Sequence, residues 1–81
     1  MSKNTKKTAR YKGWRVVWHG GEYAEILPPG GRVPVDALNF WDHDADAPLR
    51  DYTSRDLRDE LAAWYKDNEG ILSDHLAAAG Y

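Results

Sequence analysis

Cysteine is absent from this chain of 81 residues, so neither a disulfide nor a thiolate zinc site can stabilise its fold. No apolar run approaches the ~18 residues that a membrane span needs, and no apolar stretch of the secretory type follows the basic N-terminus. These absences predict a cytoplasmic protein with no membrane partner. The small core must draw on four Trp and five Tyr, because each aromatic ring can bury about 150–250 Å².

Acidic residues are missing from the first 15 positions, which is the second informative absence. Six of the 11 Lys and Arg lie there, whereas the other five share the rest of the chain with all 13 Asp and Glu. A segment of formal charge +6 therefore precedes a body of formal charge −8 (five minus 13). Opposite charges on one small protein can attract different partners, or a second copy of the chain. The six basic residues are Lys3, Lys6, Lys7, Arg10, Lys12 and Arg15.

The domain organisation follows from the distribution of apolar residues. Residues 1–10 have almost none, which predicts a flexible basic arm, since such a segment cannot repay the entropy lost on ordering. Residues 11–81 are predicted to form a single α+β domain.

Trp14, Val16 and Trp18 alternate with other residues, and this period of two predicts a strand over residues 14–18. The following Gly-Gly pair suits a two-residue hairpin turn, so residues 22–27 are expected to return antiparallel. This turn places Trp18 opposite Tyr23, Val16 opposite Glu25 and Trp14 opposite Leu27.

Two prolines and two glycines end the second strand, because proline cannot donate to a ladder and glycine reverses the chain easily. A third short strand is expected over residues 32–35. Residues 36–41 fit either a helical turn or a fourth strand, and the Phe-Trp pair in this short run favours extended structure.

Helix signals are clear in the last third of the chain. Thr53 fits an N-cap and Asp56 completes a capping box, with Tyr52 and Leu57 placed as a hydrophobic staple. An apolar stripe follows at helical spacing, and Gly70 reads as a C-terminal cap, after which residues 71–79 suit a second helix. The stripe consists of Leu57, Leu61, Trp64 and Tyr65. The predicted architecture is a small antiparallel sheet, an N-terminal hairpin plus one or two strands, packed by two C-terminal helices.

No catalytic grouping is present, so we expect a protein that is not an enzyme and needs no cofactor. The three His are scattered, and no glycine-rich segment has phosphate-loop or dinucleotide-loop spacing. The alternating acids that begin at Asp42 are similar to a calcium loop, but Ala47 and Thr53 stand where that loop needs Gly and Glu. No metal site is therefore expected.

The leading hypothesis is a non-enzymatic accessory protein that binds another protein through an aromatic and acidic surface. Its predicted contact residues are Trp41, Asp42, Asp44 and Asp46, because exposed Trp is enriched at interfaces and charge adds electrostatic steering. The composition is rich in Ala, Asp, Arg and Trp, lacks Cys and places Lys mostly in a short leader. In composition alone it resembles small orphan proteins of high-GC actinobacteria and their phages. That resemblance implies an accessory role exerted by binding a host protein.

Two alternatives remain open. Nucleic acid could bind the arm through Lys3, Lys6, Lys7, Arg10, Lys12 and Arg15, with nearby aromatic rings for stacking. The acidic half could instead mimic nucleic acid and block a basic groove on another protein. Self-association through opposite charges or strand edges is also compatible with the sequence, which fits a monomer or a homodimer.

Overall fold

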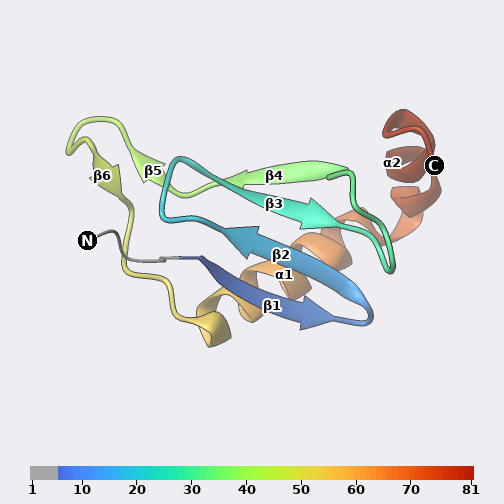
Figure 1. Cartoon of the computed structure of the whole chain (residues 1–81), viewed down its shortest axis with the longest axis horizontal. Coiled ribbons are helices and arrows are strands. Elements are labelled where there is room, and N and C mark those ends of the chain that lie inside the picture. Colours follow the sequence, from blue (N-terminus) through green and yellow to red (C-terminus); the bar gives the residue numbers. More distant parts are fainter. Residues whose placement is uncertain (1–5) are drawn as a thin grey trace.

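The computed structural model describes residues 6–81 as an α+β domain. Four antiparallel strands form a sheet in the order β1-β2-β3-β4, and a long helix covers one face of it (Figure 1). A second, two-stranded sheet projects from one end. The elements are β1 (Lys7–Tyr11), β2 (Trp14–Trp18), β3 (Tyr23–Leu27), β4 (Asp36–Asn39), β5 (Trp41–Asp42), β6 (Ala47–Pro48), α1 (Ser54–Asn68), a 3₁₀ turn η1 (Glu69–Ile71) and α2 (Leu72–Ala78).

The basic segment contains a strand where a flexible arm was predicted. Residues 7–10 belong to β1, which pairs with all of β2, so the prediction is wrong for these residues; residues 1–5 of the predicted arm lie outside the described residues. Lys12 (φ 51°) and Gly13 (φ 84°) form the turn, and positive φ at both central positions is typical of a tight two-residue hairpin. Ala9 and Tyr11 pack against the core, which repays the ordering of this polar strand.

The second hairpin forms as predicted, but its register is one residue away from the predicted one. Val16 lies opposite Ile26 and Trp18 opposite Ala24. Only the first glycine of the turn has positive φ, and the loop is longer than two residues. The Trp18 indole closes this loop by donating to the Gly21 carbonyl at 2.9 Å. A shift of one residue exchanges the two faces of a strand, and here it buries Ala24 and Ile26 completely.

The third strand begins later than predicted. Residues 32–35 are not a strand; they belong to the connection between β3 and β4, and the fourth strand of the sheet is β4. The extended structure expected for residues 36–41 is found in β4 and β5. The Val35 N–H donates to the Ile26 carbonyl at 2.8 Å, so the connection joins the ladder just before β4.

The capping box at the start of α1 is confirmed. The Asp56 N–H donates to Thr53 Oγ1 at 3.1 Å, and the Thr53 N–H donates to Asp56 Oδ2 at 3.0 Å. The Thr53 N–H favours the charged carboxylate and, together with the Thr53 side chain, lowers the pKa of Asp56 below its ordinary value. The predicted apolar stripe is also confirmed in its first three members, Leu57, Leu61 and Trp64, which are buried.

The predicted stop after α1 is only partly right. The helix ends at Asn68, but Gly70 lies inside the 3₁₀ turn without a positive φ, so the chain continues into α2. The glycine with a positive φ at a helix end is Gly80 (φ 89°), which follows α2. The Tyr81 N–H donates to the Leu76 carbonyl at 2.9 Å and closes this helix.

The two predicted helices do not both cover the sheet. α1 lies across it, whereas α2 lies beyond its end (Figure 1). Leu72 and Leu76 reach the margin of the core, and the His75 ring lies 5.3 Å from the Trp64 ring. Within the part of the chain that the structure describes, no helix has the length and apolar content needed to cross a membrane.

The core between sheet and helix is rich in stacked and edge-packed aromatic rings. Phe40 stacks on Tyr52 with centroids 3.9 Å apart, and both contact the Trp18 ring edge to face, at 5.8 and 5.4 Å. Trp14 and Trp64 meet at 5.5 Å. Such pairs add roughly 0.5–1.5 kcal/mol each beyond the area they bury. Aromatic packing therefore stabilises a fold that has no disulfide.

Candidate anion-binding site on the open face of the sheet

One face of the sheet has no helix over it, and we call it the open face. Strand alternation decides which side chains it carries. In β1 the residues at odd positions point toward α1, so Thr8 and Arg10 lie on the open face. Arg15 is the cross-strand partner of Arg10. Farther along the sheet, Tyr23 and Glu25 are exposed on the same face.

Alternation also divides the basic residues that the sequence presents as one arm. Lys7 lies on the helix side, where its Nζ donates to the Tyr52 carbonyl at 2.7 Å and to Asp51 Oδ1 at 3.3 Å. Lys12 Nζ lies over the Tyr65 ring, 5.3 Å from its centroid. These two lysines make contacts within the protein, whereas Arg10 and Arg15 lie on the open face, where a ligand can reach them. Lys6 is exposed just before β1, and Lys3 lies outside the described residues.

The β1–β2 turn and the connection that follows β3 lie at the same end of the sheet (Figure 1). A pocket of about 410 Å³ lies between them on the open face. Three arginines line it, because residue 32 of the connection adds a third arginine to the cross-strand pair. We call this site the arginine pocket. It is lined by Arg10, Gly13, Arg15, Pro29, Gly30, Gly31 and Arg32.

Close approach of three segments builds the arginine pocket. A Cβ on Gly13 would lie 3.2 Å from Pro29 Cγ, so the turn and the connection are in contact. A Cβ on Gly31 would lie 2.5 Å from both Pro28 Cγ and Tyr81 Oη. Glycine at position 31 therefore lets the C-terminal tyrosine pack directly against the connection.

Hydrogen bonds fix the same connection in place. Tyr81 Oη donates to the Val33 carbonyl at 2.6 Å and accepts the Val33 N–H at 2.7 Å. The Arg15 guanidinium donates to the Gly31 carbonyl. Because a guanidinium has five N–H donors, Arg15 keeps others for a ligand.

The positive charge of the arginine pocket is not neutralised inside the protein. Among residues 6–81, Lys7–Asp51 and Arg50–Asp56 form ion pairs and His43 lies 3.9 Å from Glu22, and none of these contacts uses an arginine of the pocket. Guanidinium groups bind carboxylates and phosphates through two parallel hydrogen bonds. The arginine pocket therefore has the chemistry that suits an anionic ligand.

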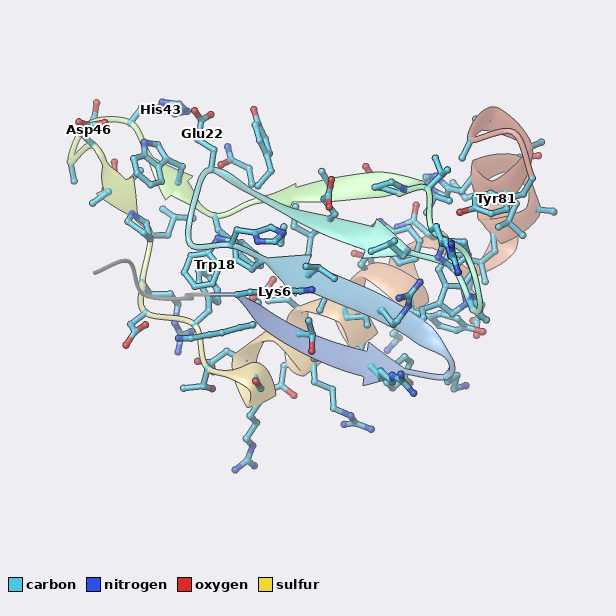
Figure 2. All side chains as sticks on the ribbon, in the orientation of Figure 1. Lys6, Trp18, Glu22, His43, Asp46 and Tyr81 are labelled. Carbon is cyan, nitrogen blue, oxygen red and sulfur yellow. The ribbon has the colours of Figure 1, made fainter. Side chains whose placement is uncertain are left out.

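The acidic residues singled out from the sequence lie at the opposite end of the molecule (Figure 2). Trp41, Asp42, Asp44 and Asp46 are brought together by β5, β6 and their turn, which we call the acidic hairpin (residues 41–48). Trp41 is half-buried. The Asp42 carboxylate accepts the Asp44 N–H at 3.0 Å, so it forms the turn, whereas Asp44 and Asp46 are exposed. No group of three His, Asp or Glu able to hold a metal is found among residues 6–81.

Sequence reasoning named Arg10 and Arg15 but missed the other five residues that line the arginine pocket, Arg32 among them, and it also missed the supporting Tyr81. The Gly-Gly-Arg run after two prolines signalled a turn, but it gave no sign that the turn would meet Arg10 and Arg15. Comparisons with protein-family models, with curated proteins and with solved structures find no match for this chain. The geometry of the site is therefore the basis for a functional proposal.

Proposed function

We propose that this chain is a non-enzymatic module that binds single-stranded nucleic acid on the open face of its sheet. The observation that carries the proposal is the convergence of Arg10, Arg15 and Arg32 on one pocket without an internal counter-charge. Phosphate contacts by arginine and lysine supply most of the affinity of sequence-independent nucleic-acid binding.

The rest of the open face suits a single strand better than a duplex. Tyr23 is 55% exposed. Arg15 lies opposite Leu27, four residues from Tyr23 along β3, which is about 13 Å at ~3.3 Å per residue. An exposed ring on the same sheet face as basic side chains can stack an unpaired base, and the exposed Glu25 lies between Tyr23 and Arg15 on this face. A duplex reader of the helix-turn-helix type would need a basic second helix for the major groove, and the short α2 has no Lys or Arg.

The salt dependence of binding tests this proposal. A fluorescently labelled oligothymidylate should bind with an affinity that falls as salt rises, because each phosphate contact on a single strand adds about −0.7 to the log–log slope. Arg10→Gln or Arg32→Gln should weaken binding and reduce the magnitude of that slope by about 0.7. Fluorescence anisotropy at four or more salt concentrations measures both quantities.

Arg55→Gln is the matched control, because Arg55 is exposed on α1, on the other side of the sheet. It removes the same charge and should leave the slope unchanged. An equal loss of affinity in the Arg55 and Arg32 variants would show that binding depends on net charge alone, and it would reject the open face as the site.

A second candidate function is the binding of a basic protein partner by the acidic hairpin. The observation that favours it is the projection of this hairpin from the sheet with Asp44 and Asp46 exposed at its turn. Such a surface can act as an accessory contact or can compete with nucleic acid for a basic groove.

Charge reversal of the acidic hairpin tests the second candidate. The double variant Asp44→Lys with Asp46→Lys keeps the Asp42 carboxylate that forms the turn, so the hairpin should still fold. Proteins captured from nuclease-treated host lysate by the wild-type chain should be lost with this variant and kept with Arg32→Gln. A partner retained by the charge-reversed hairpin must bind elsewhere.

A further inference from the structure

We propose that the arginine pocket binds the terminal phosphate of a nucleic-acid strand, a phosphate monoester, in preference to the phosphodiesters inside it. This inference rests on the proposed function, since it names the part of the strand that the pocket holds. It concerns one end of the open face, whereas the proposed function concerns the whole face.

The number of charges in one place supports a monoester. An internal phosphodiester carries a single negative charge, whereas a phosphate monoester carries about −1.5 to −2 at pH 7 and offers three strong acceptor oxygens. Guanidiniums spread along a groove would each meet a different phosphodiester. Here Arg10, Arg15 and Arg32 line the same pocket, so their three positive charges border one site and favour a ligand group with more than one negative charge.

The walls of the arginine pocket allow a ligand to approach the main chain. Among its lining residues is Gly30, where a Cβ would meet no atom within 4 Å, so no side chain at this position holds a ligand away from the backbone. The volume of about 410 Å³ exceeds the space of a phosphate alone and lies in the range of small-ligand pockets, ~300–1,000 Å³. A phosphate together with its sugar fits this description.

The pocket is also organised before a ligand arrives. The Gly31 carbonyl accepts from the Arg15 guanidinium, and the Tyr81 phenol holds the same connection through Val33. A side chain that is already held in place loses less entropy when it binds. The structure therefore presents Arg15 as a fixed donor, with the exposed Arg10 and Arg32 beside it.

A carboxylate of an acidic protein surface is the main competing anion. A carboxylate carries one charge and two oxygens, so it cannot accept paired hydrogen bonds from three guanidinium groups at once. The dianionic monoester matches the pocket better in charge and in acceptor number. The acidic hairpin of a second copy would offer only separate carboxylates, of which Asp42 already accepts hydrogen bonds within its own turn.

The test compares three short oligothymidylates of the same length and sequence, with a 5′-phosphate, a 3′-phosphate or no terminal phosphate. Each carries a fluorescent label on an internal base, and affinity is measured by anisotropy at one salt concentration. One of the two phosphorylated strands should bind about tenfold more tightly than the unphosphorylated strand. Arg32→Gln should abolish this preference, and Arg55→Gln should retain it.

The outcomes separate the inference from the proposal beneath it. Equal affinity for all three strands would overturn the terminal-phosphate site while leaving nucleic-acid binding intact. No binding of any strand would overturn both. A preference that survives Arg32→Gln, and equally Arg15→Gln, would place the terminal phosphate outside the arginine pocket and would also reject the inference.

Discussion

Replacing Trp64 with alanine is expected to lower the free energy of unfolding by about 3–5 kcal/mol, the usual cost of removing a buried Trp. The Trp64 side chain is buried between α1 and the sheet, where its ring meets Trp14 at 5.5 Å. Its Nε1 donates to Asp36 Oδ2 at 2.8 Å, at the start of β4, and His75 of α2 packs on it. One side chain thus joins the long helix, an edge strand and the last helix.

Urea denaturation followed by circular dichroism measures this loss. A domain of this size has a total stability of roughly 4–12 kcal/mol at 0.05–0.15 kcal/mol per residue, so the alanine variant should unfold at low denaturant. Trp64→Phe keeps most of the ring but removes the donor to Asp36, and we expect a smaller loss of about 1 kcal/mol from the hydrogen bond. An alanine variant no less stable than the phenylalanine variant would contradict the packing described for this ring.

Replacing Gly31 with alanine should reduce the affinity for a single strand about tenfold or more. The new Cβ would lie 2.5 Å from both Pro28 Cγ and Tyr81 Oη, so the connection must move. The Arg15 contact with the Gly31 carbonyl would be lost with it. Overpacking of this kind also costs about 1–3 kcal/mol of stability. Anisotropy and urea denaturation on the same samples measure the two effects.

Gly21→Ala is the matched control for Gly31→Ala. Gly21 has no positive φ, and no atom lies within 4 Å of the position that its Cβ would take, so both affinity and stability should stay near wild type. Adding Tyr81→Ala to the Gly31 variant removes one of the two clashes and should recover part of the stability. Unchanged binding by Gly31→Ala alone would show that the position of this connection does not set the affinity.

Local signals in the sequence were sufficient for the parts of the fold that depend on neighbouring residues. The capping box at Thr53 and the stripe that follows it involve residues three or four positions apart, and both were predictable. The alternation of Trp14, Val16 and Trp18 identified the buried face of β2 correctly. The acidic hairpin also gathers residues that are close in sequence, so its cluster could be recognised without a structure.

The parts that could not be predicted depend on contacts between distant residues. In the sequence, β1 looks like a polar arm. Its order could not be predicted, because Tyr52 and Asp51, the partners of Lys7, lie more than 40 positions away. The register of β2 and β3 follows from burying Ile26, not from the glycine pair. The arginine pocket joins Arg10 and Arg15 to Arg32, and its support comes from Tyr81, which is 48 positions from Val33.

The alternation within β1 has a consequence for how variants of this protein should be compared. A chain in which Lys7 and Thr8 exchange places has the same mass, the same composition and the same isoelectric point as the original. In that isomer the ammonium group would leave the Tyr52 carbonyl and enter the open face beside Arg10. Homologues should therefore be compared by whether each basic residue of β1 occupies an odd or an even position. Net charge does not distinguish a lysine that contacts the helix side from one that faces a ligand.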